Sequence, residues 1–111
     1  MTKYGFGESI LSVPAQKRLY DLIDYLIRYF EISPDSAVSY LARFNDNKAV
    51  YTYLNKYPDI GLNTILRGAA AGKNFELIDY LVEKGADINE IWGLYEDVTF
   101  YIRQKYPHLI V

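Results

Sequence analysis

Residues 64–89 read TILRGAAAGKNFELIDYLVEKGADIN. In the second half of this stretch apolar residues recur three and four positions apart, which is the spacing of one face of an α-helix. Asn74 precedes that run and can cap the helix, while Gly85 follows it and can take the positive φ that ends a helix. The small residues before Asn74 would let a preceding helix approach its neighbour closely. The stretch therefore predicts two helices joined by a turn.

A related pattern occurs three times along the chain. The sequence LIDYL at residues 22–26 recurs at residues 77–81, and residues 50–54 fill the corresponding place between them, at spacings of 28 and 27 residues. The isoleucines that close each unit lie 28 residues apart, at Ile32, Ile60 and Ile88. A one-residue slip inside the third unit would reconcile the two spacings. A period of this length predicts an array of short repeated units.

Helical periodicity and helix-end signals predict six helices. The first covers residues 13–32, begins near Ser12 and Pro14, and has an inner face formed by Leu19, Leu22, Ile23, Leu26, Ile27 and Phe30. The second begins at Ser33 and Pro34 and runs to about Phe44, and the third follows Asp46 as its cap. The fourth begins near Leu62 or Asn63, the fifth runs from its cap Asn74 to Lys84, and the sixth covers about residues 95–105. The expected inner faces are Ala37, Val38, Leu41 and Ala42 in the second helix and Ile65, Leu66, Ala69 and Ala70 in the fourth. No segment alternates with period two, so we expect an all-α fold with little or no β-structure.

Residues 64–89 resemble one ankyrin repeat, whose usual pattern TPLHxAAxxGHxEVVxLLLxxGADVN aligns with them without a gap. Ile65 and Arg67 replace the usual proline and histidine, and Lys73 fills the place of the usual mid-repeat glycine. The unit is shorter than the family's repeat of about 33 residues, so the hairpin finger between helix pairs is expected to be trimmed. Short arrays of this kind resemble those of large DNA viruses, phages and bacterial effectors.

The resemblance implies one ankyrin-like helical solenoid over residues 1–111. We expect five segments, which are a flexible N-terminus at 1–11, an N-terminal helix at 13–32, a divergent repeat at 33–60, the clear repeat at 61–89, and a capping helix with its tail at 90–111. A chain of 111 residues is of the right length for one such domain.

Composition narrows the class of function. The formal net charge is −2 without a basic run, so no nucleic-acid partner is expected. The chain has no cysteine, which excludes disulfides and thiolate metal sites and favours the cytoplasm, including that of a host cell. No apolar run reaches the length of about 18 residues that crosses a bilayer, so no membrane association is expected. We also expect no metal and no cofactor.

Residues suited to catalysis lack the partners that catalysis needs. The sequence GFGES at residues 5–9 only faintly resembles a phosphate-binding loop, since it has no following lysine and no preceding strand. His108 is the only histidine and has no partner motif. Asp21 and Asp24 share a helix face at a spacing of three, and Asp79 repeats the position of Asp24, a recurrence that favours a solvated helix face over an acid–base pair. The sequence therefore does not predict an enzyme.

Ankyrin arrays bind proteins and carry no chemistry of their own, so the resemblance implies a non-catalytic protein-binding module, acting as a stand-alone inhibitor or an adaptor that occludes or tethers its partner. In the family the partner contacts the links and the exposed face of the first helix of each pair. Carried over position by position, these contacts include several small residues, and the candidates that we select among them to bind a partner are Arg43, Phe44, Asn63, Trp92 and Tyr95. Tryptophan, tyrosine and arginine contribute most binding energy at interfaces. Trp92 could instead cover the open end of the core.

A second hypothesis is a structural subunit that self-associates into a homo-oligomer through the ends of the solenoid. The outer side of the first helix is polar enough to close one end, and it carries Tyr20, Asp21, Asp24, Arg28 and Tyr29. The apolar tail at residues 109–111 either packs down or forms the interface at the other end.

Overall fold

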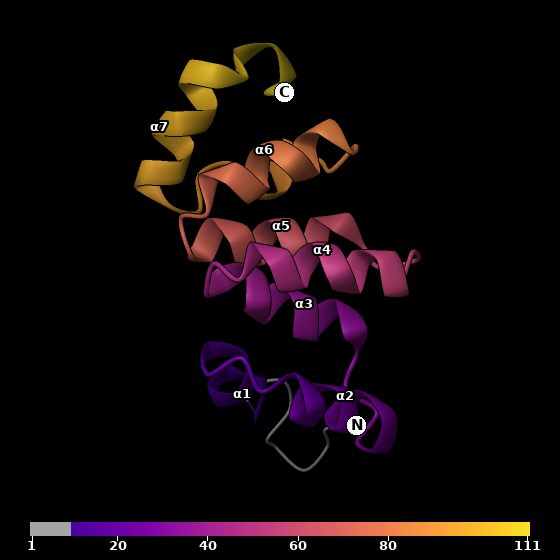
Figure 1. Cartoon of the computed structure of the whole chain (residues 1–111). Helices are drawn as coiled ribbons and strands as arrows, with labels where there is room; N and C mark the ends of the chain where they lie inside the picture. Colours follow the sequence, from indigo (N-terminus) through magenta and orange to yellow (C-terminus); the bar gives the residue numbers. More distant parts are fainter. Residues whose placement is uncertain (1–9) are drawn as a thin grey trace.

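The computed structural model describes residues 10–111, in which every regular element is helical (Figure 1). No strand occurs within that range, so the predicted all-α class is confirmed. The expected flexible segment at residues 1–11 falls largely outside the described residues, as does the GFGES sequence at residues 5–9. The elements of the described part are α1 (Ser12–Gln16), α2 (Tyr20–Tyr29), α3 (Pro34–Arg43), α4 (Asn47–Lys56), α5 (Leu62–Ala71), α6 (Phe75–Glu83), the 3-10 helix η3 (Ile88–Glu90), α7 (Glu96–Lys105) and the 3-10 helix η4 (Pro107–Leu109).

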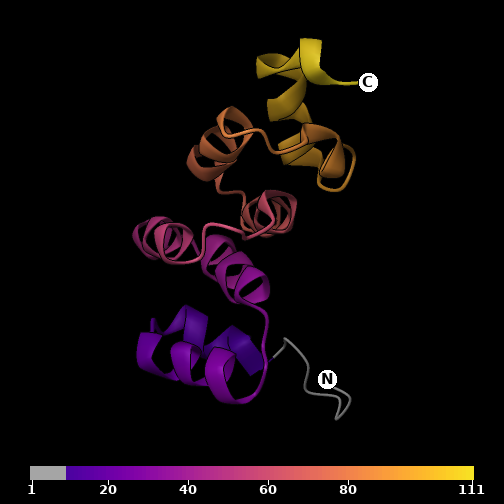
Figure 2. The same cartoon turned by 90° about the vertical axis from the view of Figure 1, so that its right-hand side faces the viewer.

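The helices are arranged as successive pairs. α1 packs on α2, α3 on α4, and α5 on α6, while the first helices α1, α3 and α5 also pack on one another. The pairs follow one another along the long axis of a molecule that measures 42 × 28 × 23 Å, as the two perpendicular views show (Figures 1 and 2). Each pair therefore contacts mainly the pair before it and the pair after it.

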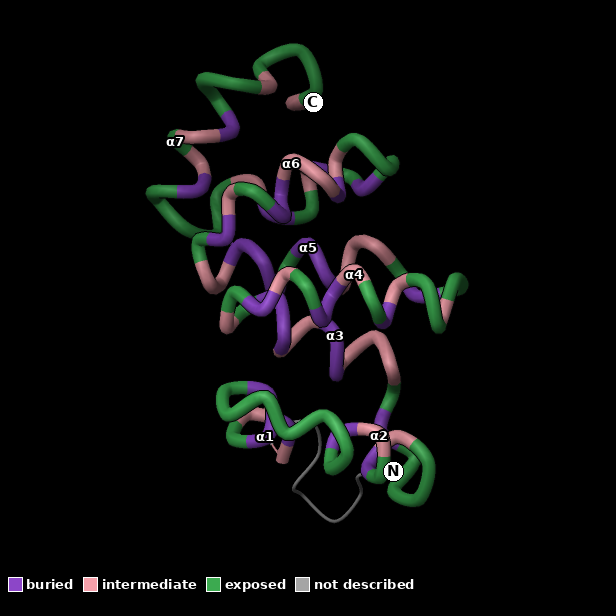
Figure 3. The backbone as a smooth tube through the Cα atoms, in the orientation of Figure 1, coloured by how far each residue is buried: buried purple, intermediate pink, exposed green. Residues whose placement is uncertain are grey.

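One continuous core runs through the pairs (Figure 3). Its members include the three isoleucines that close the repeated units, all of which are buried as their recurrence suggested. The predicted inner faces of α3 and α5 are also confirmed, because all eight of their residues are buried, namely Ala37, Val38, Leu41, Ala42, Ile65, Leu66, Ala69 and Ala70. The 28-residue period therefore marks equivalent places in the core.

Three predicted helix caps are confirmed. The Ser33 side chain accepts a hydrogen bond from the Asp35 backbone N–H at 3.1 Å, with proline at the first helical position. Asp46 accepts from the Ala49 backbone at 3.4 Å and so caps α4. Asn74 accepts from the Leu77 backbone at 3.3 Å and caps α6. Side chains of this kind satisfy backbone donors that the first turn of a helix leaves unpaired.

The turn inside each helix pair places a residue other than glycine at positive φ. Arg18, Asn45 and Lys73 have φ values of 59°, 61° and 53°. Lys73 is the residue predicted to stand where the ankyrin pattern has glycine, and it adopts the left-handed conformation that glycine takes readily. Such a conformation costs about 1 kcal/mol or more for a residue with a Cβ atom. These turns therefore adopt the left-handed conformation without glycine, the residue that adopts it most readily.

The single helix predicted at residues 13–32 is wrong. Arg18 turns the chain between α1 and α2, so there are two short helices that pack on each other. Ser12 is the first residue of α1, and the residue before it makes no side-chain cap. Ile23 and Leu26 of the predicted inner face are buried, but three members of that face are more than 40% exposed, namely Leu19, Leu22 and Phe30. The turn at Arg18 leaves them on the outside of α2.

The predicted alignment of residues 50–54 with residues 22–26 and 77–81 is wrong by one residue. The N-cap residues Leu19, Asp46 and Asn74 are 27 and 28 positions apart, so Val50 corresponds to Ile23 and Ile78 rather than to Leu22 and Leu77. The burial pattern agrees, because Ile23, Val50 and Ile78 are all completely buried. The one-residue difference therefore lies in the first unit, between the start of α2 and Ile32, and not in the third.

The closest packing between pairs involves two glycines of α5 and the main chain of α3. Gly68 and the C-cap residue Gly72 are four positions apart and lie on the same side of the helix. A Cβ atom at Gly68 would overlap the carbonyl group of Ser39, and one at Gly72 would overlap the carbonyl group of Arg43. The two helices can approach this closely only because these side chains are absent.

Candidate protein-interaction surface

A shallow groove lies between α3 and α5, on the face formed by the first helices of the pairs. It has a volume of about 220 Å³ and is lined by Ser39, Tyr40, Arg43, Arg67, Gly68 and Ala71. Gly68 lies in this lining because close packing of α5 on α3 leaves no room for a side chain there. We call this the α3–α5 groove. It includes Arg43, one of the residues predicted to bind a partner.

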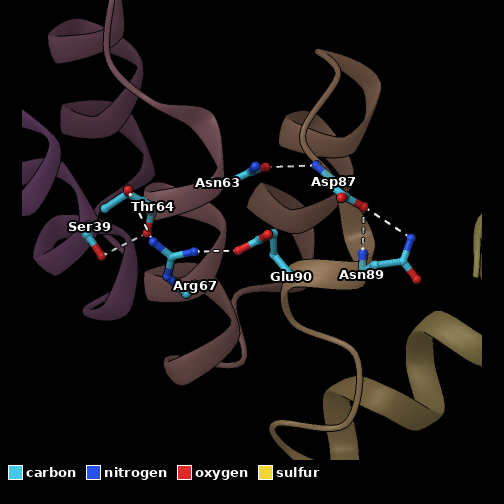
Figure 4. Close-up of polar contacts among 7 residues, drawn as sticks. All are labelled: Ser39, Asn63, Thr64, Arg67, Asp87, Asn89 and Glu90. Carbon is cyan, nitrogen blue, oxygen red and sulfur yellow. Dashed lines mark hydrogen bonds and ion pairs between the residues drawn. The ribbon is translucent and has the colours of Figure 1, made fainter. Parts of the chain in front are cut away.

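A chain of polar contacts runs along the same face from α3 to η3 (Figure 4). The Ser39 hydroxyl donates to the carbonyl oxygen of Thr64 at 3.1 Å. The Arg67 guanidinium donates to the Thr64 hydroxyl at 3.4 Å and to the Glu90 carboxylate at 2.7 Å. The Arg67–Glu90 pair is about half exposed, so it adds little stability, but it fixes the direction of the guanidinium. Sequence reasoning did not find Arg67 as part of the surface.

Arg43 differs from Arg67 in its charge environment. It is the last residue of α3, its side chain is exposed, and it has no ion-pair partner among residues 10–111. A guanidinium group presents several N–H donors in a fixed plane that matches a carboxylate. Arg43 is therefore the cation of the groove that is open to a carboxylate from another molecule.

Phe44 and Asn63 are also predicted to contact a partner, but both side chains make contacts within the protein. Phe44 is half-buried and packs against the core. The Asn63 side chain accepts a hydrogen bond from the Asp87 backbone at 2.8 Å, and the Asp87 carboxylate in turn accepts one from the Asn89 backbone at 2.9 Å (Figure 4). Asn63 lies in the first turn of α5, at the opposite end of that helix from Gly72 and the neighbouring Arg43. The structure therefore does not bring Asn63 into the groove.

Trp92 and Tyr95 lie in the link before α7. Trp92 is half-buried against the core, and the Arg103 guanidinium lies 5.7 Å from the centre of its ring. Its position fits the alternative that it covers the end of the core. Tyr95 is the N-cap residue of α7 and is exposed, without a side-chain capping bond. Neither residue lines the α3–α5 groove.

The opposite face, formed by the second helices, carries two bridged carboxylates. Asp24 accepts a hydrogen bond from the Tyr53 hydroxyl at 2.6 Å. Asp79 accepts bonds from the hydroxyls of Tyr101 and Tyr106 at 2.6 and 2.7 Å, and from the Lys105 ammonium at 2.7 Å. The prediction of a merely solvated face is therefore wrong for Asp24 and Asp79. The recurrence of the aspartate together with 12 tyrosines was the signal that could have revealed these bridges.

The bridges change the proton affinities of their members. Burial alone would raise the pKa of Asp79, but the hydrogen bonds from Lys105, Tyr101 and Tyr106 outweigh it and lower that pKa. Burial, followed by the bond to Asp79, raises the pKa of Tyr106 to about 12. Burial and then the bond to Asp24 likewise raise the pKa of Tyr53. The Tyr53 and Tyr106 hydroxyls therefore stay protonated, and remain donors, to a higher pH than an ordinary tyrosine.

We expect Asp79→Asn to lower the free energy of unfolding at pH 7 by about 1 kcal/mol, because an amide is a weaker acceptor than a carboxylate. Folding lowers the pKa of Asp79, so its contribution is complete above the ordinary value of 3.8 and is lost as the pH falls below that value. Urea unfolding at pH 7 and at about pH 3 measures the difference. Asp59→Asn, at an exposed link residue, is the control. An Asp79→Asn effect that is undiminished at the lower pH would contradict this account.

A larger cavity, of about 420 Å³, lies between α2 and α4. Its lining includes the buried Asp46, which accepts a hydrogen bond from the Tyr20 hydroxyl and lies 3.7 Å from the Arg18 guanidinium. Asp24 and Tyr53 also line it and are bonded to each other. Both of its carboxylates are thus already engaged with side chains of the protein.

Metal-binding clusters and membrane-spanning helices are both absent from the described part of the chain. Residues 10–111 contain no group of three or more histidine, aspartate or glutamate side chains placed to hold a metal ion. Within the same range, no helix combines the length and the apolar character that a bilayer crossing requires. No protein-family model, curated protein or solved structure shows a significant match to this chain.

Proposed function

We propose that the protein is a short ankyrin-like solenoid that acts as a non-catalytic binding module and holds a partner protein on the face formed by α3 and α5. The 28-residue period, the paired helices and the packing of α1, α3 and α5 on one another support the solenoid. A stiff face of this kind suits an inhibitor that occludes its partner or an adaptor that tethers it. Both actions fit a protein of the cytoplasm.

The α3–α5 groove is the observation that carries this proposal. At about 220 Å³ it is smaller than the pockets of about 300–1,000 Å³ that enclose small molecules. It therefore suits one or two side chains of a partner rather than a whole ligand. Arg67 is neutralised by Glu90, whereas Arg43 has no such partner within residues 10–111. The favoured partner segment thus carries an aspartate or glutamate that reaches Arg43.

A library of random peptides displayed on phage tests this proposal, because selection from it does not require the identity of the partner. Peptides selected on the wild-type protein should be rich in aspartate and glutamate. Arg43→Gln should weaken their binding about tenfold or more, since it removes a charge-assisted hydrogen bond. Lys48→Gln is the control, because Lys48 is also exposed but lies on α4, away from the groove. Isothermal titration with the selected peptides gives both affinities.

The proposal fails if the selected peptides bind equally well to the wild-type and Arg43→Gln proteins. It also fails if Lys48→Gln causes the larger loss, since the binding face would then be the one formed by the second helices. Circular dichroism of each variant must match that of the wild type for either result to count.

A further inference from the structure

The outer side of α2 is an apolar surface that no element within residues 10–111 covers. Leu22, Tyr25 and Tyr29 are 41%, 50% and 63% exposed. Because they are spaced at three and seven positions, they lie along one side of the helix. The Tyr25 ring lies 4.9 Å from that of Tyr29 and 5.9 Å from that of Phe30, so the aromatic side chains form one cluster. The end expected to be closed by polar residues therefore carries a contiguous apolar stripe.

One position of this stripe, that of Leu22, is covered in the other two helix pairs. Aligned by N-cap residues, Leu22 corresponds to Ala49 and Leu77, which are both buried. The caps of α4 and α6 also bond to the preceding pair, since Asp46 accepts from Tyr20 and Asn74 donates to the carbonyl oxygen of Ala42. Leu22 thus occupies a position at which another helical layer packs, whereas the positions of Tyr25 and Tyr29 are exposed or half-buried in the other two pairs. Contiguous apolar surface of this kind on a protein marks an interaction site.

The charged residues beside the stripe indicate what kind of helix can pack on it. Asp21 and Arg28 are exposed, are seven positions apart and lie on the same flank of α2. Seven residues of helix span about 10 Å, so the two side chains are too far apart to pair with each other. Neither has an ion-pair partner among residues 10–111. In an antiparallel copy of the same helix the order of the two charges is reversed, so each charge faces its opposite.

The shape of this side agrees with such a pairing. A hollow of about 200 Å³ on α2 is lined by Asp21, Asp24, Tyr25, Arg28 and Tyr29. It lies beside Leu22, whose side chain projects from the same stripe. A second copy that lies antiparallel brings its own Leu22 towards this hollow, and it receives the first copy's Leu22 in return. An interface in which the same patch serves both subunits is the commonest arrangement in protein dimers.

We propose that two copies of the chain associate through their α2 helices, packed antiparallel about a two-fold axis that passes between Asp24 and Tyr25. Asp21 of each copy pairs with Arg28 of the other, and the Leu22, Tyr25 and Tyr29 stripes are buried against each other. The surface is separate from the α3–α5 groove, so each copy keeps its groove open. Dimerisation and partner binding can therefore be tested independently.

Sedimentation velocity on the full chain tests the dimer. We expect the wild type to dimerise and Tyr25→Ser to be monomeric at the same concentration. Asp21→Arg alone sets two arginines against each other, and Arg28→Asp alone sets two aspartates against each other, so each should weaken the homodimer about tenfold or more. An equimolar mixture of these two variants should regain the wild-type affinity, because every contact in the heterodimer again joins opposite charges. Arg43→Gln, in the groove, should leave the dimer unchanged.

Three results would overturn the proposal. The first is a wild-type protein that remains monomeric at about 1 mM, where even a complex with a dissociation constant of about 1 mM is substantially formed. The second is a dimer that survives Tyr25→Ser, or whose charge variants do not recover on mixing. The third is a monomer that instead captures a different protein through Leu22 and Tyr25. Tyr25 is exposed, so its replacement leaves the fold intact and the test stands even if a charge variant folds poorly.

Discussion

Gly68→Ala is expected to lower the free energy of unfolding by about 3 kcal/mol, which is the upper part of the usual range for overpacking. The added methyl group would overlap the carbonyl of Ser39, and this obstacle is main chain that cannot rotate away. Helix propensity alone predicts the opposite sign, because alanine is favoured over glycine by about 1 kcal/mol inside a helix. Thermal and urea unfolding of the two proteins therefore distinguish packing from propensity by sign as well as by size.

Gly61→Ala is the matched control for this substitution. Gly61 immediately precedes the same helix, and its added methyl group would meet only side-chain atoms, the Asp35 carboxylate at 3.1 Å and the Thr64 hydroxyl at 3.9 Å. We expect a change within about 0.5 kcal/mol there, and a loss at Gly72→Ala similar to that at Gly68→Ala. A Gly68→Ala protein that is more stable than the wild type would show that α3 and α5 do not approach as described.

Asn74→Ala is expected to have the second largest effect, a loss of about 2–3 kcal/mol. Asn74 is only 3% exposed. Its amide donates to the carbonyl oxygen of Ala42 at 2.9 Å and to the Asn47 side chain at 2.6 Å, while its oxygen caps α6. Alanine removes the cap and also leaves the Ala42 carbonyl without this donor in a buried place. Urea unfolding gives the loss directly.

Asn55→Ala provides the comparison, because Asn55 is exposed on α4 and its replacement should change stability by about 0.5 kcal/mol or less. If Asn74→Ala lost only the value of about 1 kcal/mol that is typical of a cap, the bond to the preceding pair would contribute nothing. The size of the loss thus measures how strongly the second and third pairs are joined at this point.

Local chemistry explains why much of the fold could be predicted from the sequence. Ser33, Asp46 and Asn74 each carry an oxygen that bonds to the backbone two or three residues later, so the information about these caps lies within one turn. Gly85 was expected at positive φ for a similarly local reason, and its φ is 108°. The start of α7 was predicted to within one residue.

The parts that were mispredicted depend on contacts or conformations with no local signal. Arg18 has a positive φ although arginine gives no indication of a turn, so α1 and α2 were merged into one helix. The exposure of Leu22 follows from the absence of a covering layer among the described residues, and a helical periodicity cannot reveal that. The bridges to Asp24 and Asp79 join residues more than twenty positions apart.

In the candidate surface, too, some features could be predicted from the local sequence and others depend on residues far apart in the chain. Arg43 could be predicted by transferring a repeat position, since exposure at the end of α3 depends on the helix alone. The groove beside it could not, because it arises from the approach of Gly68 to the main chain of Ser39, 29 positions earlier. Asn63 was assigned to a partner because its position is exposed in ankyrin repeats, whereas here its oxygen is engaged by the backbone of Asp87.

The hydrogen bonds between neighbouring helix pairs have a consequence for synthesis on the ribosome. Within the described part of the chain, side-chain hydrogen bonds between different elements join residues 20 to 32 positions apart and no farther. A nascent chain therefore needs only about thirty further residues to complete the contacts of each pair as it emerges. Low sequence separation between contacting residues also makes folding fast, on the scale of microseconds to milliseconds. Folding can thus advance from the N-terminal pair towards α7 at the pace of translation, with little apolar surface waiting for its partner.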